Sequence, residues 1–160
     1  MKIEDEDNYN SLLYKIVNLA SNLLVNTLED IYFKTDYLTK QNNDEASYCY
    51  KIKKKDTYIN FSQTASEVYG KIRAFSPVPG AKCFVNGELL KVLEAKIEDS
   101  FEKHKNHSLV LDNNLLISCG TGSIRLTKVQ RQGKKVMSAK DILNGWNIEK
   151  GVIFNEETQN

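Results

Sequence analysis

The second half of the chain consists of short apolar runs separated by turn residues, a pattern that few folds accommodate. Asn86 and Gly87 both tolerate the positive φ of a type I′ turn, and they separate residues 82–85 from residues 88–97, which predicts a β-hairpin. Further short runs occupy residues 108–111, 115–119 and 123–130. About five short strands at this spacing predict a closed or nearly closed OB-like Greek-key β-barrel.

A long amphipathic helix is predicted near the N-terminus. From Ser11 to about Lys34, apolar residues recur at the i, i+3, i+4 and i+7 spacing of one helix face. They are Leu12, Leu13, Ile16, Val17, Ala20, Leu23, Leu24, Leu28 and Ile31. Such a stripe needs a surface to cover it, so we expect this helix to bind a partner or a second copy of the chain.

Two shorter helices are predicted next to the strands. Thr64 and Glu67 have the spacing of a capping box before a helix over residues 65–75, which ends at a turn containing two prolines. Ser138 can cap a short C-terminal helix with Asp141 as its reciprocal partner. The predicted fold class is α+β, with an N-terminal helix and linker, then the barrel with a helix before it and a short C-terminal helix.

The net charge of +1 conceals an uneven distribution along the chain. Residues 1–48 carry four basic and nine acidic side chains, whereas residues 49–160 carry eighteen basic and twelve acidic ones. The segment 121–140 has no acid, and its cations are Arg125, Lys128, Arg131, Lys134, Lys135 and Lys140. A local excess of cations is expected of a surface that binds nucleic-acid phosphates, although a solvated lysine-rich face is the alternative.

Two stretches of the sequence resemble a known family. The strings IRAFSPVPGA, residues 72–81, and VQRQGKKVMSAKDILNG, residues 129–145, are similar in order and separation to the C-terminal domain of methionyl-tRNA formyltransferases. Residues 41–52, QNNDEASYCYKI, resemble that family's interdomain linker, and Phe61 stands where the family has tryptophan. The N-terminal helix resembles the last helix of the family's catalytic domain.

The resemblance implies a division of the chain into four parts. Residues 1–40 hold the acidic N-terminus and a helix from the edge of the catalytic domain, and residues 41–61 form a basic linker. Residues 62–150 form the OB-like domain, and residues 151–160 form a tail. We expect the catalytic N-terminal domain, with its Asn, His and Asp constellation, to be absent from this chain.

The resemblance also implies a partner, the initiator methionyl-tRNA. We expect the linker lysines, which alternate onto one face of an extended segment, and the cations of the acid-free segment to bind it. The expected tRNA-binding residues are Lys51, Lys53, Lys55, Arg125, Lys128, Arg131, Lys134 and Lys135. We expect no catalytic residue, cofactor or metal in this chain, because 10-formyltetrahydrofolate, the formyl donor, would bind to the rest of the full enzyme.

The remaining reactive side chains carry no recognisable motif. His104 and His107 lie in a lysine-rich loop without a third metal ligand nearby in the sequence. Cys49, Cys83 and Cys119 are too far apart for a zinc or disulfide pattern, so we expect buried, reduced thiols. The N-terminus shows no secretory signal and no apolar run spans a bilayer, so we expect a cytoplasmic protein without a membrane partner.

Two other functions fit parts of the sequence. The chain also resembles the barrel subdomain of sugar-nucleotide formyltransferases, although the string GKKVMSA, residues 133–139, favours the tRNA enzyme. A decayed fragment that acts as a protein-interaction module through its N-terminal helix is the second alternative. A separate chain that supplies the catalytic domain would be a further partner.

Overall fold

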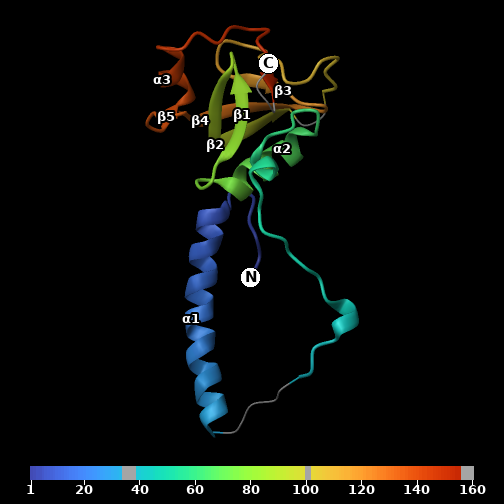
Figure 1. The fold of residues 1–160 in the computed structure, drawn as a ribbon, viewed down its shortest axis with the longest axis vertical. Coiled ribbons are helices and arrows are strands. Elements are labelled where there is room, and N and C mark those ends of the chain that lie inside the picture. Colours follow the sequence, from blue (N-terminus) through green and yellow to red (C-terminus); the bar gives the residue numbers. More distant parts are fainter. Residues whose placement is uncertain (34–38, 100–101, 156–160) are drawn as a thin grey trace. The chain divides into compact units, whose positions relative to one another are not determined.

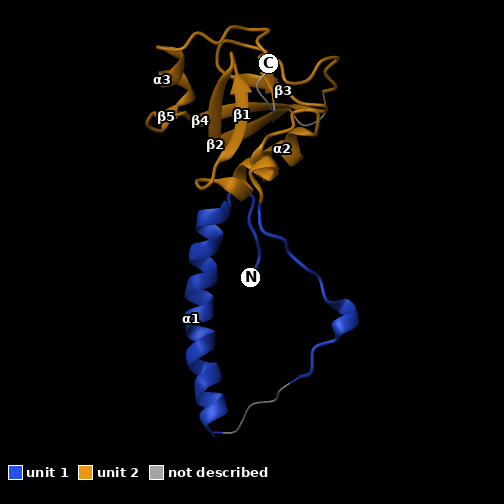
Figure 2. Cartoon of the chain, viewed as in Figure 1, with its two compact units in different colours: residues 1–52 blue, residues 53–160 orange. Residues whose placement is uncertain are grey.

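The computed structural model describes residues 1–33, 39–99 and 102–155. The chain forms two compact units, residues 1–52 and residues 53–160, which are coloured separately in Figure 2.

The first unit consists mainly of helix α1, Tyr9–Phe33. The side chain of Asn8 accepts a hydrogen bond from the Ser11 amide at 3.0 Å, which caps the helix and starts it two residues before the expected position. The predicted end at Lys34 lies outside the described residues. No residue of α1 is buried, and nine side chains of its apolar stripe and flanks are at least 43% exposed. These are Leu13, Ile16, Val17, Leu19, Leu23, Leu24, Val25, Leu28 and Ile31.

Asp7 anchors the start of α1. Lys15 donates to the Asp7 carboxylate at 2.7 Å and Ser11 Oγ donates to it at 2.8 Å. These bonds, that from Lys15 above all, lower the pKa of Asp7 from 3.8 to about 2. The carboxylate therefore stays charged and holds the first turn of the helix. Among the described residues, no helix combines the length and the apolar character needed to cross a bilayer.

The second unit contains a curled antiparallel sheet in the form of a half-barrel (Figure 1). Its strands are β1 Ala81–Val85, β2 Glu88–Asp99, β3 Leu116–Ser118, β4 Ser123–Arg131, β5 Met137–Ser138 and β6 Phe154–Asn155. The strand order is β3-β4-β2-β1-β6, and β5 pairs with β4. Asn86 and Gly87 have φ angles of 50° and 75°, as the predicted type I′ turn between β1 and β2 requires.

Two helices lie next to this sheet. Helix α2, Ala65–Phe75, has the predicted bounds, and the Thr64 and Glu67 side chains form the predicted capping box. Helix α3 covers Ala139–Leu143, and its N-cap Ser138 accepts a hydrogen bond from the Asp141 amide at 3.1 Å. The α+β class is therefore confirmed.

The core of the second unit is one cluster of buried side chains from α2, α3 and the strands. Phe61 and Phe154 are 2% and 1% exposed and meet edge to face with ring centroids 6.0 Å apart. Phe61 thus fills the core, and its ring is not available to stack on a base. The other fully buried large side chains are Ile59, Ile72, Leu90, Leu115, Ile117, Ile124, Leu126, Val68, Val85 and Val92.

Two segments differ from expectation. Residues 108–111 form isolated bridges instead of a regular strand, because Leu109 pairs with Ile153 and Val110 pairs with Ile117. Residues 151–155, expected as a tail, contribute β6, which pairs with β1 and buries Phe154.

Candidate nucleic-acid interface

Strand β4 carries three of the expected cations, and acids from other segments pair with them. Arg125 Nε lies 2.7 Å from Glu98 and its Nη1 lies 3.0 Å from Asp112. Lys128 binds Glu94, its direct cross-strand partner on β2. The segment without acids in the sequence therefore lies beside an acidic strand in the fold, and much of its positive charge is neutralised.

The pair of Arg125 and Asp112 is reinforced by the backbone. Burial raises the pKa of Asp112, but hydrogen bonds from the amides of Asn114 and Leu116 and from Arg125 outweigh it, so the pKa lies below 3.8. Only 19% of the Arg125 side chain is exposed. This guanidinium holds the turn before β3 and is a poor candidate for a phosphate contact.

Arg131 at the end of β4 is also fixed. Its Nη2 donates to both Glu88 carboxylate oxygens at 2.8 and 2.7 Å, and its guanidinium lies 4.3 Å from the ring centroid of Trp146. A bidentate pair and a cation–π contact together leave the arginine in one position.

Lys134 and Lys135 differ from the cations of β4. They follow a tight turn in which Gly133 has φ of 70°, a conformation that favours glycine. The Lys134 amide donates to the Arg131 carbonyl at 3.1 Å, and Gln130 Nε2 donates to the Lys134 carbonyl at 2.8 Å. Within the described ranges, neither lysine has an acidic partner, so a rigid turn presents two exposed ammonium groups.

A pocket of about 230 Å³ lies beside this turn. Its lining combines cations with apolar groups from β5 and α3. The lining residues are Arg131, Lys134, Lys135, Met137, Asp141, Ile142 and Gly145. The cations and apolar groups of this lining suit a ligand with an anionic group next to a flat or apolar one, and Asp141 adds one carboxylate to the same lining.

The extended segment expected to carry the three linker lysines is interrupted. Lys51 belongs to the first unit, whereas Lys53 and Lys55 belong to the second. The expected alternation fails because a 3-10 helix, η2, begins at Lys54 and runs to Thr57. The Lys53 amide donates to Asp56 Oδ2 at 2.7 Å, which fixes the start of that helix. All three lysines are exposed.

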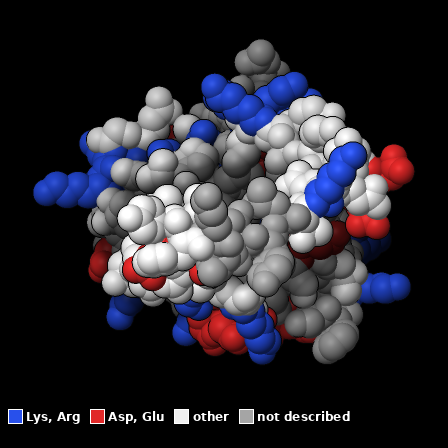
Figure 3. Space-filling model, turned by 90° about the horizontal axis from the view of Figure 1, so that it is seen from below, with Lys and Arg blue, Asp and Glu red and all other residues white. Residues whose placement is uncertain are grey.

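The structure also contains a cationic cluster that was not predicted from the sequence. Lys82 on β1 lies directly opposite Lys91 on β2, and Lys54 of η2 is close enough to influence Lys82 electrostatically. The signal was available, because a hairpin centred on Asn86 and Gly87 places residue 82 opposite residue 91. Figure 3 shows that basic and acidic side chains are both exposed in one view of the surface, so total charge does not locate such a cluster.

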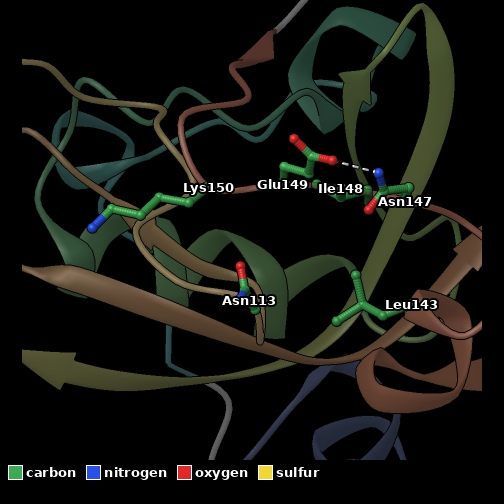
Figure 4. Close-up of a pocket in the computed structure, with 6 residues that line it drawn as sticks. All are labelled: Asn113, Leu143, Asn147, Ile148, Glu149 and Lys150. Carbon is green, nitrogen blue, oxygen red and sulfur yellow. Dashed lines mark hydrogen bonds between the residues drawn. The ribbon is translucent and has the colours of Figure 1, made fainter.

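A larger pocket of about 540 Å³ lies elsewhere on the second unit (Figure 4). Asn113 and Leu143 line one side, and the loop of residues 147–150 lines the other. Asn147 Nδ2 donates to Glu149 Oε1 at 2.7 Å, so the one carboxylate of this pocket is already engaged. Glu149 and Lys150 are the titratable side chains in this lining, which contains no second carboxylate and no histidine.

Comparison with known proteins identifies the family. Residues 51–147 match the family model described as formyl transferase, C-terminal domain. The chain belongs to the formyltransferase family through this domain. The match includes all eight expected tRNA-binding residues, the pocket beside the Gly133 turn and the Lys82–Lys91 pair.

Curated relatives of this formyltransferase domain include methionyl-tRNA formyltransferases. The chain is 33% identical over 154 residues to the methionyl-tRNA formyltransferase of Rickettsia felis, covering 95% of this chain and 49% of the relative. It is 39% identical over 121 residues to that of Allorhizobium ampelinum, covering 73% of this chain and 38% of the relative. The chain thus spans about half the length of the first of these relatives.

Solved structures share the fold, and HypX is among them. A variant of HypX from Aquifex aeolicus matches with a TM-score of 0.66 and 16% identity, covering 94% of this chain and 28% of HypX. At this identity the likeness concerns the fold of the formyltransferase domain alone.

Two of the three cysteines are buried and one is exposed. Cys83 and Cys119 are buried, and burial raises the pKa of both thiols, that of Cys119 to about 12. Cys49 is exposed, contrary to the expectation of a buried thiol, because it lies in the irregular linker. Among the described residues, no three His, Cys, Asp or Glu side chains gather as metal ligands would.

Proposed function

We propose that this chain is the tRNA-binding C-terminal part of a methionyl-tRNA formyltransferase and that by itself it binds initiator methionyl-tRNA without transferring a formyl group. The family match and the names of the relatives support the tRNA partner. The full enzyme would bind 10-formyltetrahydrofolate outside this chain, and we place the protein in the cytoplasm.

We also propose that the curled sheet is an OB-like Greek-key barrel, because residues 108–111 bridge toward both β3 and β6.

The observation that carries the proposal is the presentation of Lys134 and Lys135. The turn already holds the backbone at Lys134, so binding a phosphate there costs side-chain freedom and little backbone freedom. Within the described residues, neither Lys134 nor Lys135 has to break an ion pair with an acid before it binds a phosphate. Phosphate contacts of this kind supply most of the affinity of proteins for nucleic acids.

The other expected residues have different parts in this proposal. Arg125, Lys128 and Arg131 already bind carboxylates, so each would exchange a protein partner for a phosphate at little net gain. Lys51, Lys53 and Lys55 are exposed and would add contacts without reading sequence. Binding would therefore be weak, in about the micromolar range at physiological salt, with little preference for the initiator tRNA.

The exposed stripe of α1 supports a second partner. A contiguous apolar surface marks a site of association, so we propose that α1 binds the catalytic domain of the family or a second copy of this chain.

The experiment compares two double variants of the chain. Lys134→Gln with Lys135→Gln should weaken binding to all tRNAs alike and reduce the magnitude of the slope of log K against log salt by about 2, one unit per phosphate contact. The control, Lys103→Gln with Lys105→Gln, removes the same charge from a loop outside the pocket. If the control loses as much affinity as the first variant, binding is diffuse attraction and the site proposal is wrong.

A further inference from the structure

Three lysines gather on the β1–β2 hairpin of the second unit. Lys82 and Lys91 are direct cross-strand partners, so their side chains leave the same face of the sheet. Burial, then Lys91 and then Lys54 lower the pKa of Lys82, which places all three ammonium groups within electrostatic range. In the described part of the chain, none of the three has an acidic partner.

This arrangement is unfavourable for the fold alone. Like charges placed directly opposite each other in an antiparallel pair destabilise it, and the neighbouring β2–β4 pair avoids this by placing Glu94 opposite Lys128. An anion between Lys82 and Lys91 would turn their repulsion into two attractions. A bound anion would therefore stabilise this hairpin.

Aromatic rings lie next to these cations. Phe84 follows Lys82 by two positions on β1, so it shares the outward face, and its ring stacks on Tyr58 with centroids 5.8 Å apart and planes 18° apart. Both rings are partly exposed. Flat rings beside ammonium groups match a nucleotide, whose base stacks while its phosphate binds the cation.

Tyr58 is held in place by its backbone. Its residue bridges to Lys82, the Ile59 amide donates to the Lys82 carbonyl at 2.7 Å, and Lys71 Nζ donates to the Tyr58 carbonyl at 2.6 Å. The segment that carries Tyr58 is thus fixed to β1 and to α2, and the ring pair is formed before any ligand arrives.

We propose that the hairpin surface, defined as Lys54, Tyr58, Lys82, Phe84 and Lys91, binds a single-stranded segment of RNA. The phosphate lies between Lys82 and Lys91, and the adjacent base stacks on the Tyr58–Phe84 pair. Single-stranded RNA is required because a base in a duplex has both its faces covered. The inference rests on the proposed function, to which it adds a second contact and the kind of RNA bound there.

The test uses the full chain with two probes, an unstructured oligouridylate and an RNA duplex of equal length. Lys82→Gln with Lys91→Gln should weaken binding of the single strand about tenfold and reduce the magnitude of its salt slope by about 0.7, the value for the one phosphate that the two lysines share. Binding of the duplex should change by less than about twofold. Lys103→Gln with Lys150→Gln removes the same charge outside the hairpin surface and should leave both affinities close to wild type.

A second variant tests the rings apart from the charges. Tyr58→Leu should weaken binding of the single strand about tenfold with an unchanged salt slope, because stacking involves no counterion release. Thermal unfolding of each variant establishes that the fold is retained. If the lysine variant binds the single strand as its charge-matched control does, or if polyglutamate binds as tightly as the RNA, the inference is wrong.

Trp146 separates this inference from the proposed function. It is the single tryptophan of the sequence, and it stacks on Arg131 beside the Gly133 turn. RNA bound at Lys134 and Lys135 should change its emission, whereas RNA bound only at the hairpin surface should not. Suppose that tRNA changes Trp146 emission and binds the Lys82→Gln, Lys91→Gln variant as tightly as the wild type. This result would overturn the inference and leave the proposed function intact.

Discussion

At Gly120, the addition of a single methyl group should lower the free energy of unfolding substantially. An ideal Cβ at this residue would lie 2.0 Å from the carbonyl oxygen of Ser62 and 2.8 Å from its carbon. Carbon and oxygen without a covalent bond normally approach no closer than about 3.3 Å. Gly120→Ala therefore requires a backbone shift of about 1 Å between two segments that are far apart in the sequence.

The cost follows from the contacts at this point. The Gly120 amide donates to the carbonyls of Phe61 and Gln63, both at 2.9 Å, and the shift that makes room for the methyl group lengthens these bonds. Loss of this hydrogen bonding costs about 1 kcal/mol and the strain of overpacking about 1–3 kcal/mol. The expected loss of about 2–4 kcal/mol is large for a domain whose total stability is about 5–15 kcal/mol.

Gly70→Ala is the matched control, since it adds the same methyl group. Gly70 lies inside α2, and a Cβ there meets no atom within 4 Å, so the variant should gain up to about 1 kcal/mol of helix stability. Urea unfolding followed by circular dichroism measures both changes. An unfolding free energy of Gly120→Ala within about 0.5 kcal/mol of wild type, at an unchanged slope, would refute the argument from the close contact.

Three further outcomes are expected. Leu24→Lys with Leu28→Lys should shift the chain toward monomer in sedimentation, because the exposed stripe of α1 drives association; a wild type that is already monomeric would contradict this. Purified chain should transfer no formyl group from 10-formyltetrahydrofolate to methionyl-tRNA, and turnover above a buffer control would contradict this. Cys49 alone should react with a thiol reagent in the folded protein, with Cys83 and Cys119 reacting only in denaturant, because burial raises the pKa of both thiols.

Elements with local signals were predictable from the sequence. Helix α2 is eleven residues long, and both of its ends have a signal in the sequence: the Thr64 and Glu67 capping box at the start and the proline turn at the end. The Asn86–Gly87 turn sets the first hairpin. Phe154 gave no such signal, because a strand of two residues is defined only by its partner β1. The alternation of the linker lysines failed at η2, where Asp56 caps a turn that a periodic pattern does not reveal.

The candidate site was only partly predictable, for an electrostatic reason. Lys134 and Lys135 depend on a local turn, and the sequence located them correctly on a loop beyond a strand end. Arg125, Lys128 and Arg131 seemed equivalent to them, but their acidic partners lie 27, 34 and 43 residues earlier in the chain. A count of charges along a segment cannot include partners that only folding supplies.

The pairing of acids on β2 with cations on β4 limits which amino-acid substitutions this sheet can accept during evolution. Replacing Lys128 by a neutral residue would leave the Glu94 carboxylate beside the sheet without its counterion, and replacing Glu94 would add an uncompensated cation. Substitutions on the two strands should therefore arise together among related chains, with sign reversals at both members of a pair. Lys82 and Lys91 repel each other instead, so a lysine should persist at both positions only where the ligand is bound.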